Sequence, residues 1–248
     1  MWNLILTPQQ YSQTLQELLE LEFWYANKRA LKEEKTFEDA INQYTEIYYY
    51  STEYKPDVPA AKNENWQKIV MELSNKEDEL WSSIKDYITP RIQDDLKRSQ
   101  TEIKNSYFGF MYEFCPEYES DSNEDFLTIH FRNYFAPDSP FVHACKLKEG
   151  LRQVVEKAMF ERPDITQVQC ASWLNNRPEF TGLFPEQWLK RSNFCYPMTA
   201  STGWWGRFID RKGLLNQKAA DELKSEMRFT MPNRHCRCLI EELHDFVK

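Results

Sequence analysis

The first hundred residues of this chain contain no glycine, no histidine and no cysteine. All 6 glycines lie at or after Gly109, all 4 histidines at or after His130, and all 6 cysteines at or after Cys115. Tight turns favour glycine above other residues, so a long segment without it indicates packed helices. We therefore expect a helical region over residues 1–105 and a mixed α/β region over residues 106–248 that contains the candidate site.

Helical spacing is the main signal in the first region. Thr7, Pro8 and Gln10 have the pattern of a helix start, with a capping hydroxyl, a proline at the first helical position and a glutamine that completes a capping box. Thr36 begins a second helix, and Pro90 should kink or break a later one. The apolar positions that recur at helical spacing include Tyr11, Leu15, Leu18, Leu19, Phe37, Ile41, Tyr44, Trp66, Ile69, Val70, Leu73 and Ile88.

The second region mixes strands and helices. Aromatic and alternating residues predict strands at 107–114 and 126–132, joined as a hairpin by a long acidic loop. A helix at 147–160 and a strand at 166–174 complete a strand–helix–strand crossover. Further helices are predicted at 178–190, 216–227 and 234–246. The whole chain should be an α+β protein, with the N-terminal helical region packed on a small mixed β-sheet with flanking helices.

Charge and composition exclude several classes of protein. The net charge of −8 argues against a nucleic-acid partner, because affinity for a phosphate backbone comes from Lys and Arg. Aromatic residues make up 15% of the chain, and disordered chains lack them, so most of it should fold. No apolar run approaches the roughly 20 residues that span a bilayer, and no secretory signal precedes the first helix. We expect a cytoplasmic protein with reduced thiols and no membrane association.

The end of the strand at 126–132 carries the first candidate for chemistry. His130 and Arg132 would point to the same face of the sheet, and Asn133 follows them. Ligands of open α/β sheets bind beyond the carboxyl ends of strands. A histidine for proton transfer beside a guanidinium for an anion would suit acyl or phosphoryl substrates, with His130 as the catalytic residue, acting as base or hydrogen-bond donor. The alternative is a histidine bound to a backbone carbonyl and an arginine paired at the surface.

A second candidate lies at the end of the strand at 166–174, where Ser172, Trp173 and Asn175 could line the same cleft as ligand-binding residues. A nucleophilic side chain there would need a general base and an orienting group. Ser172 is not part of a Gly-x-Ser-x-Gly turn, which disfavours a serine hydrolase. Cys170 lies on the predicted strand, and a cysteine on an apolar strand is usually a small buried apolar residue.

Two groups near the C-terminus also need explanation. The run Gly203-Trp-Trp-Gly-Arg207 could place Arg207 against an anionic ligand, or it could be a tight bend with core tryptophans. His235, Cys236, Cys238 and His244 are potential zinc ligands, but a Cys-x-Cys spacing fits zinc sites poorly. We therefore expect no metal site, and a C-terminal helix in place of one.

Short motifs of the second region resemble a group of uncharacterised bacterial proteins. The shared pattern is Ser172-Trp-Leu174 at a strand end, then Leu183-Phe-Pro185, then Trp205-Gly-Arg-Phe-Ile-Asp210. More distantly, the order of elements over residues 126–210 is similar to a C-terminal domain attached to acyltransferases of the Gcn5-related class. That domain pairs a histidine-bearing strand end with a Ser-Trp-Leu strand around one helix. The resemblance implies acyltransferase-like chemistry near His130, with acyl-coenzyme A as the cofactor.

Two classes of function remain open. The first is a small-molecule enzyme or enzyme-like domain related to acyltransferases, with its cleft at the strand ends. The second is a non-catalytic binding or interaction module whose aromatic cleft accepts a ligand or a segment of a partner. An enzyme predicts that His130→Ala abolishes turnover and leaves stability nearly intact, whereas a structural role predicts no effect or a loss of stability.

Overall fold

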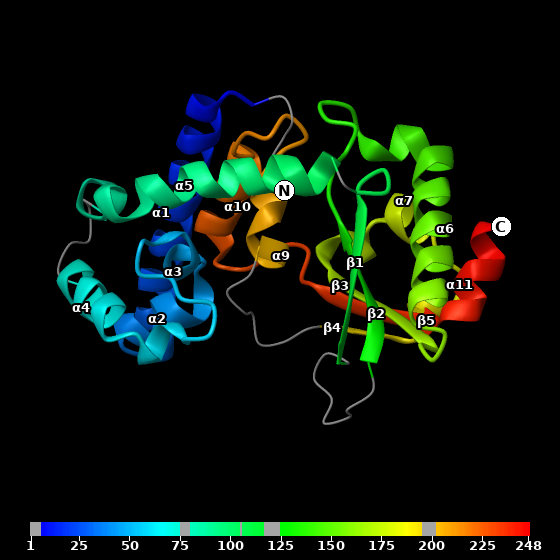
Figure 1. Ribbon diagram of the computed structural model, residues 1–248. Helices are drawn as coiled ribbons and strands as arrows, with labels where there is room; N and C mark the ends of the chain where they lie inside the picture. The colour runs from blue at the N-terminus through cyan, green and yellow to red at the C-terminus, as the bar shows by residue number, and fades with distance from the viewer. Residues whose placement is uncertain (1–5, 75–79, 105, 117–124, 195–201) are drawn as a thin grey trace.

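The computed structural model describes residues 6–74, 80–104, 106–116, 125–194 and 202–248 (Figure 1). Helices from the first hundred residues form one side of the molecule, and a five-stranded mixed sheet with its own helices forms the other. The predicted α+β fold is confirmed. None of the helices in these ranges combines the length and the apolar character needed to cross a bilayer.

The first helix begins where its capping residues predict. Thr7 Oγ1 accepts a hydrogen bond from the Gln10 backbone N–H at 3.2 Å, and Gln10 Oε1 accepts one from the Thr7 N–H at 3.0 Å. The Thr36 side chain likewise accepts from the Asp39 N–H at 3.1 Å. The helices of this side are α1 (Pro8–Glu33), α2 (Phe37–Tyr44), α3 (Ile47–Tyr50), η1 (Ala60–Lys62), α4 (Glu64–Leu73) and α5 (Leu80–Lys104).

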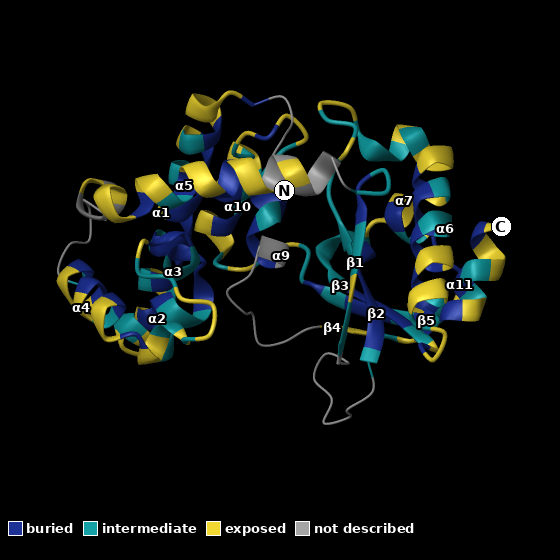
Figure 2. Cartoon of the chain, in the orientation of Figure 1, coloured by how far each residue is buried: buried dark blue, intermediate teal, exposed yellow. Residues whose placement is uncertain are grey.

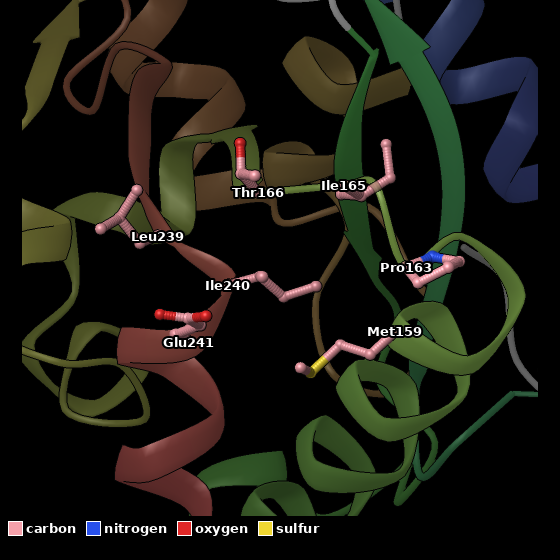
Figure 3. Close-up of a pocket in the computed structure, with 7 residues that line it drawn as sticks. All are labelled: Met159, Pro163, Ile165, Thr166, Leu239, Ile240 and Glu241. Atoms are coloured by element: carbon pink, nitrogen blue, oxygen red, sulfur yellow. The ribbon is translucent and has the colours of Figure 1, made fainter.

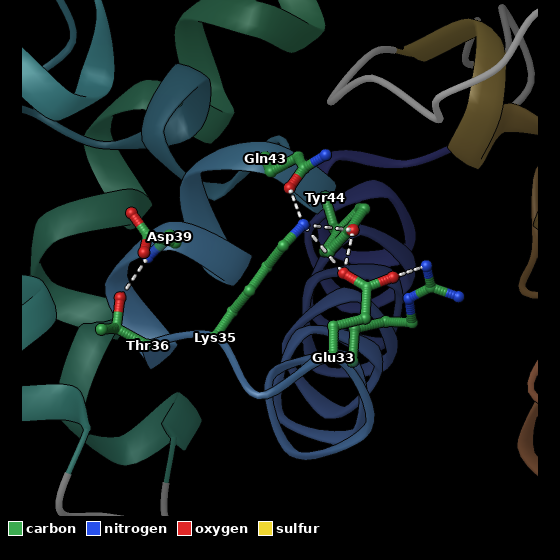
Figure 4. Close-up of polar contacts among 7 residues, drawn as sticks. Glu33, Lys35, Thr36, Asp39, Gln43 and Tyr44 are labelled. Carbon is green, nitrogen blue, oxygen red and sulfur yellow. Dashed lines mark hydrogen bonds and ion pairs between the residues drawn. The ribbon is translucent and has the colours of Figure 1, made fainter.

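A polar cluster ties α2 back to the end of α1 (Figure 4). Glu34 adopts the left-handed conformation, with φ of 54°, and ends α1. Lys35 Nζ then lies 2.9 Å from both Glu33 Oε2 and Gln43 Oε1. The Tyr44 hydroxyl donates to Glu33 Oε2 at 2.5 Å, so one carboxylate holds residues from both helices.

Pro90 was predicted to kink or break its helix, and the break does not occur, because α5 continues through the proline. A proline inside a helix removes one N–H and leaves carbonyl groups of the preceding turn in need of donors. The backbone N–H of Thr52 donates to the Tyr87 carbonyl at 2.8 Å and supplies one of them from another segment. Ile88 and Ile92 are buried on the two sides of the proline, so tertiary packing holds both halves in one helix.

The sheet has the order β1-β2-β3-β5-β4. β1 and β2 form the predicted antiparallel hairpin, whose acidic loop at 117–124 lies outside the described residues. β2 and β3 are parallel and are joined through α6 (Ala144–Glu161), which confirms the strand–helix–strand crossover. The strands are β1 (Phe110–Pro116), β2 (Asp125–Phe131), β3 (Gln167–Ser172), β4 (Ser192–Phe194) and β5 (Arg234–Leu239).

The prediction of one helix over 234–246 is wrong in its first half. Residues 234–239 form β5, which pairs antiparallel with all of β3, and α11 (Ile240–Val247) begins after it. Cys236 and Cys238 are fully buried on alternate positions, which is the burial period of a strand. The remaining helical segments are η2 (Pro140–His143), η3 (Trp173–Asn176), α7 (Pro178–Thr181), α8 (Gln187–Lys190), α9 (Thr202–Trp205), η4 (Gly206–Phe208) and α10 (Gln217–Glu226).

Among the described residues, the buried apolar side chains form two cores (Figure 2). One lies between α6, α7, α8, α11 and the face of the sheet that carries Leu127 and Val168. The other unites α1–α5 with the segment from Trp204 to Phe229. Tyr25 packs edge-on against Trp205 and Phe229, with ring centroids 5.7 and 5.3 Å apart. The segment from Trp204 to Phe229 therefore packs on the helical side, although the sequence groups it with the mixed α/β region, and β5 and α11 then belong to the sheet side.

Candidate functional site

His130 lies near the carboxyl end of β2, on the strand predicted to carry chemistry. Its ring Nε2 is 2.8 Å from Glu113 Oε1, which reaches it from β1. The two side chains are 43% and 59% exposed, so solvent and a small molecule can reach the pair. Because β2 and β3 are parallel, their carboxyl ends meet at one edge of the sheet, as a ligand site in this position requires.

A row of polar side chains crosses the sheet on the same face. Cys115 Sγ lies 2.8 Å from Thr128 Oγ1, and Gln169 Nε2 donates to that hydroxyl at 2.9 Å. His235 Nε2 is 3.1 Å from Gln169 Oε1. Thr128 and Gln169 are fully buried and His235 is 5% exposed. The row is a buried network on three neighbouring strands, with Cys115 on the fourth strand at its more accessible end.

The row does not form a thiol–imidazole pair. Cys115 is on β1 and His235 is on β5, which are three strand spacings, or about 14 Å, apart. Gln169 donates to Thr128, so its carbonyl oxygen faces His235, and His235 Nε2 carries the proton. Thr128, Gln169 and His235 were not predicted from the sequence to share a site. The signal available was the recurrence of polar residues at every second position of two predicted strands.

Asn133, also predicted at the β2 end, acts within the chain. Asn133 Nδ2 donates to the Asp138 carbonyl at 2.9 Å, and Asn133 Oδ1 accepts from the Phe135 N–H at 3.1 Å. These contacts close the turn after β2. The Arg132 N–H donates to the Gly109 carbonyl at 2.9 Å, which extends the hairpin by one residue. The Arg132 side chain is partly buried beside this turn.

The residues predicted at the β3 end form a capped 3₁₀ turn. Ser172 Oγ accepts from the Leu174 N–H at 3.2 Å, and the Trp173 carbonyl accepts from the Asn176 side-chain amide at 3.0 Å. Asn175 is 1% exposed. Its amide donates to the carbonyls of Cys170 at 2.9 Å and Arg234 at 2.7 Å, and its oxygen accepts from Trp188 Nε1 at 3.0 Å. Asn175 thus joins β3, β5 and α8.

Arg207 is also built into the scaffold. It is 8% exposed, and its Nε donates to the Trp204 carbonyl at 2.7 Å. Its terminal nitrogens donate to the Met231 carbonyl and, at 2.7 Å, to Asn233 Oδ1. Burial lowers the pKa of this guanidinium. Arg207 joins η4 to the residues that lead into β5, and the structure does not bring it together with His130.

The cysteines near the C-terminus face away from His235. Cys236 and Cys238 point into the core beneath α6 and α11, while His235 alternates to the opposite face. Burial, followed by the nearby Glu242 charge, raises the pKa of the Cys238 thiol to about 12. Within the described ranges, no three histidine, cysteine or acidic side chains come together as metal ligands.

A pocket of about 340 Å³ lies at the other end of the sheet (Figure 3). It is formed where α6 leads into β3 and where β5 leads into α11. Met159, Ile165 and Ile240 supply apolar walls, and Thr166 and Glu241 supply polar groups. The sequence offered no signal for this pocket, because its two walls lie far apart along the chain.

The helical side contains buried acids that were not predicted. Glu22 is 0% exposed, and its Oε2 accepts from the Glu46 N–H at 2.5 Å. Its Oε1 is buried without a hydrogen-bond partner among the described residues. Burial, and then the charge of Glu46, raises the pKa of Glu22 well above its ordinary value. Asp95, which accepts from the Tyr11 hydroxyl, and the fully buried Tyr50 belong to the same polar centre.

Comparison of the chain with protein-family models, with curated proteins and with solved structures gives no match. The resemblance to acyltransferases therefore stays a prediction.

Proposed function

We propose that the protein is a small-molecule enzyme in which His130, held by Glu113, exchanges a proton with a ligand bound beyond the carboxyl ends of β2 and β3. The observation that carries this proposal is the 2.8 Å contact between His130 Nε2 and Glu113 Oε1. A carboxylate accepts from the Nε2 proton of a neutral imidazole and fixes the orientation of the ring. The lone pair of Nδ1 is then left to accept a proton from a substrate.

The class of substrate follows from the neighbouring residues and from the resemblance. Arg132, directly after β2, would hold an anionic group. Acyl-coenzyme A is the first compound of this kind to test, because the resemblance implies acyl transfer. A bacterial source and a cytoplasmic location belong to the same proposal.

The test is a ligand screen by thermal shift, followed by an assay of the ligands that bind. A ligand at about a hundred times its Kd adds roughly 2.7 kcal/mol to the stability of the native state, which should raise Tm by about 5 °C or more. With acetyl-coenzyme A and a panel of amines, we expect His130→Ala to bind like wild type and to lose roughly 10²- to 10⁴-fold in rate. Glu113→Gln should lose a smaller part of the rate.

The matched control is His143→Ala, because His143 is also partly exposed and lies 3.5 Å from a carboxylate oxygen of Asp138. This variant should keep the wild-type rate and Tm shift. The proposal fails if His130→Ala and His143→Ala behave alike, or if anionic metabolites and coenzyme A thioesters leave Tm unchanged.

A specific observation favours the second candidate function, a non-catalytic module that binds a ligand or a protein. The polar atoms of Asn133, Ser172, Asn175 and Arg207 contact the chain itself. A site in which so few polar groups face outward suits recognition better than multistep chemistry. A Tm shift without turnover, unchanged in His130→Ala, would support this function.

A further inference from the structure

The pocket at the end of β3 opposite to His130 is closed on two sides by secondary structure. Its first wall is the last turn of α6 with the segment into β3, and its second wall is the junction of β5 and α11. The Ile240 N–H donates to the Thr166 carbonyl at 2.9 Å, which ties the two walls together. The two walls of the pocket are therefore joined by a backbone hydrogen bond of the fold.

The lining of the pocket is graded from apolar to polar. Ile165 and Ile240 are 5% and 2% exposed and form the interior, with Met159 beside them (Figure 3). Thr166 and Glu241 are exposed at the rim. Small-molecule sites have this character, with apolar walls and a few polar groups that set orientation and specificity.

One carboxylate gives the pocket its charge preference. Glu241 is the only charged residue among the described lining residues. Its neighbour Glu242 is engaged elsewhere, since it accepts from the Leu239 N–H at 2.9 Å and pairs with Arg191 at 3.2 Å. Glu241 lies exposed in the first turn of α11, so a cation in the pocket can reach its carboxylate.

We propose that this pocket binds a small organic cation, with an apolar body against Ile165, Ile240 and Met159 and an ammonium group at Glu241. A volume of about 340 Å³ is near the lower end for ligand pockets and suits a molecule of roughly ten non-hydrogen atoms. The site is distinct from the His130–Glu113 pair, because it precedes β3 while His130 lies toward the carboxyl end of the parallel strand β2.

The experiment compares three probes that share one apolar body: 3-phenylpropylamine, 3-phenylpropanol and 3-phenylpropanoate. Binding is followed by NMR through the methyl groups of isoleucine and methionine in the full chain. We expect the signals of Ile165, Ile240 and Met159 to move, with the amine bound about fivefold more tightly than the alcohol and the carboxylate bound most weakly. A preference of about fivefold is the size expected for an ion pair between the ammonium group and an exposed carboxylate.

Three variants test whether Glu241 causes the preference for the amine and whether the probes bind in this pocket. Glu241→Gln should reduce the preference for the amine to near onefold and leave the affinity for the alcohol unchanged. Glu186→Gln removes the same charge at an exposed position of the sheet region and should keep the wild-type preference. Thr166→Tyr places a large side chain at the exposed rim and should block all three probes.

Three results would overturn the proposal. These are tightest binding of the carboxylate probe, a preference for the amine that survives in Glu241→Gln, and no methyl shift with the amine at about 10 mM, where even millimolar affinity would saturate the site. None of them depends on turnover, so His130→Ala should bind the amine like wild type whether or not the proposed enzymatic function holds.

Discussion

Replacing Arg207 by methionine should lower the free energy of unfolding by about 3 kcal/mol or more. The change keeps an apolar stem against Trp204 and Phe229, whose ring centroids lie 5.0 and 4.8 Å from the guanidinium carbon. It removes the hydrogen bonds to the carbonyls of Trp204 and Met231 and to Asn233 Oδ1. Those acceptors would then be left in a largely buried setting without their donors.

Urea denaturation followed by tryptophan fluorescence measures this loss, because Trp204 and Trp205 lie in the affected core. The control is Arg228→Met, which removes an arginine that is 75% exposed and paired with Glu226, and which should change stability by less than about 0.5 kcal/mol. If Arg207 held a ligand instead, Arg207→Met would leave the urea midpoint near that of wild type and weaken binding.

Arg207 also shows what the sequence could and could not predict. An arginine close to two tryptophans in the sequence is a reasonable signal for an anion site. Residue type alone does not show whether the guanidinium binds a ligand or a backbone carbonyl of the chain. The difference is set by Met231 and Asn233, which lie more than twenty positions further along the chain. The same holds for Asn175, whose partners Arg234 and Trp188 come from two other elements.

Patterns of residues close together in the sequence predicted the helices and strands better than they predicted the site. The capping box at Thr7 and the crossover between β2 and β3 were predicted correctly, because each depends on residues near in sequence. The buried row from Thr128 through Gln169 to His235 depends on the register of three strands, and β5 reaches its place only after the chain has returned to the helical side. No spacing in the sequence encodes such a register.

The second large expected effect on the free energy of unfolding comes from replacing the buried Glu22, and it is an increase, whereas Arg207→Met causes a decrease. Glu22→Gln should stabilise the protein by about 1–3 kcal/mol at neutral pH, because an amide keeps an acceptor for the Glu46 N–H and removes an ionisable group whose charged form burial disfavours. The pKa of Glu22 is raised in the folded state above its ordinary value of 4.5. The contribution of protonated Glu22 to the free energy of unfolding is therefore fully present below about pH 4.5. It is lost as the pH rises through the folded-state pKa.

The two proteins should accordingly have nearly equal stability at about pH 4, and their difference should grow towards pH 8. Urea midpoints measured across this range test the slope, and the ¹³C shift of the Glu22 carboxyl carbon reports its protonation directly. Glu20→Gln, an exposed change on the same helix, should follow the wild-type slope within about 0.5 kcal/mol. A Glu22→Gln protein that is less stable than wild type at pH 8, or that keeps the wild-type slope, would show that the charged form of Glu22 is the one the fold requires.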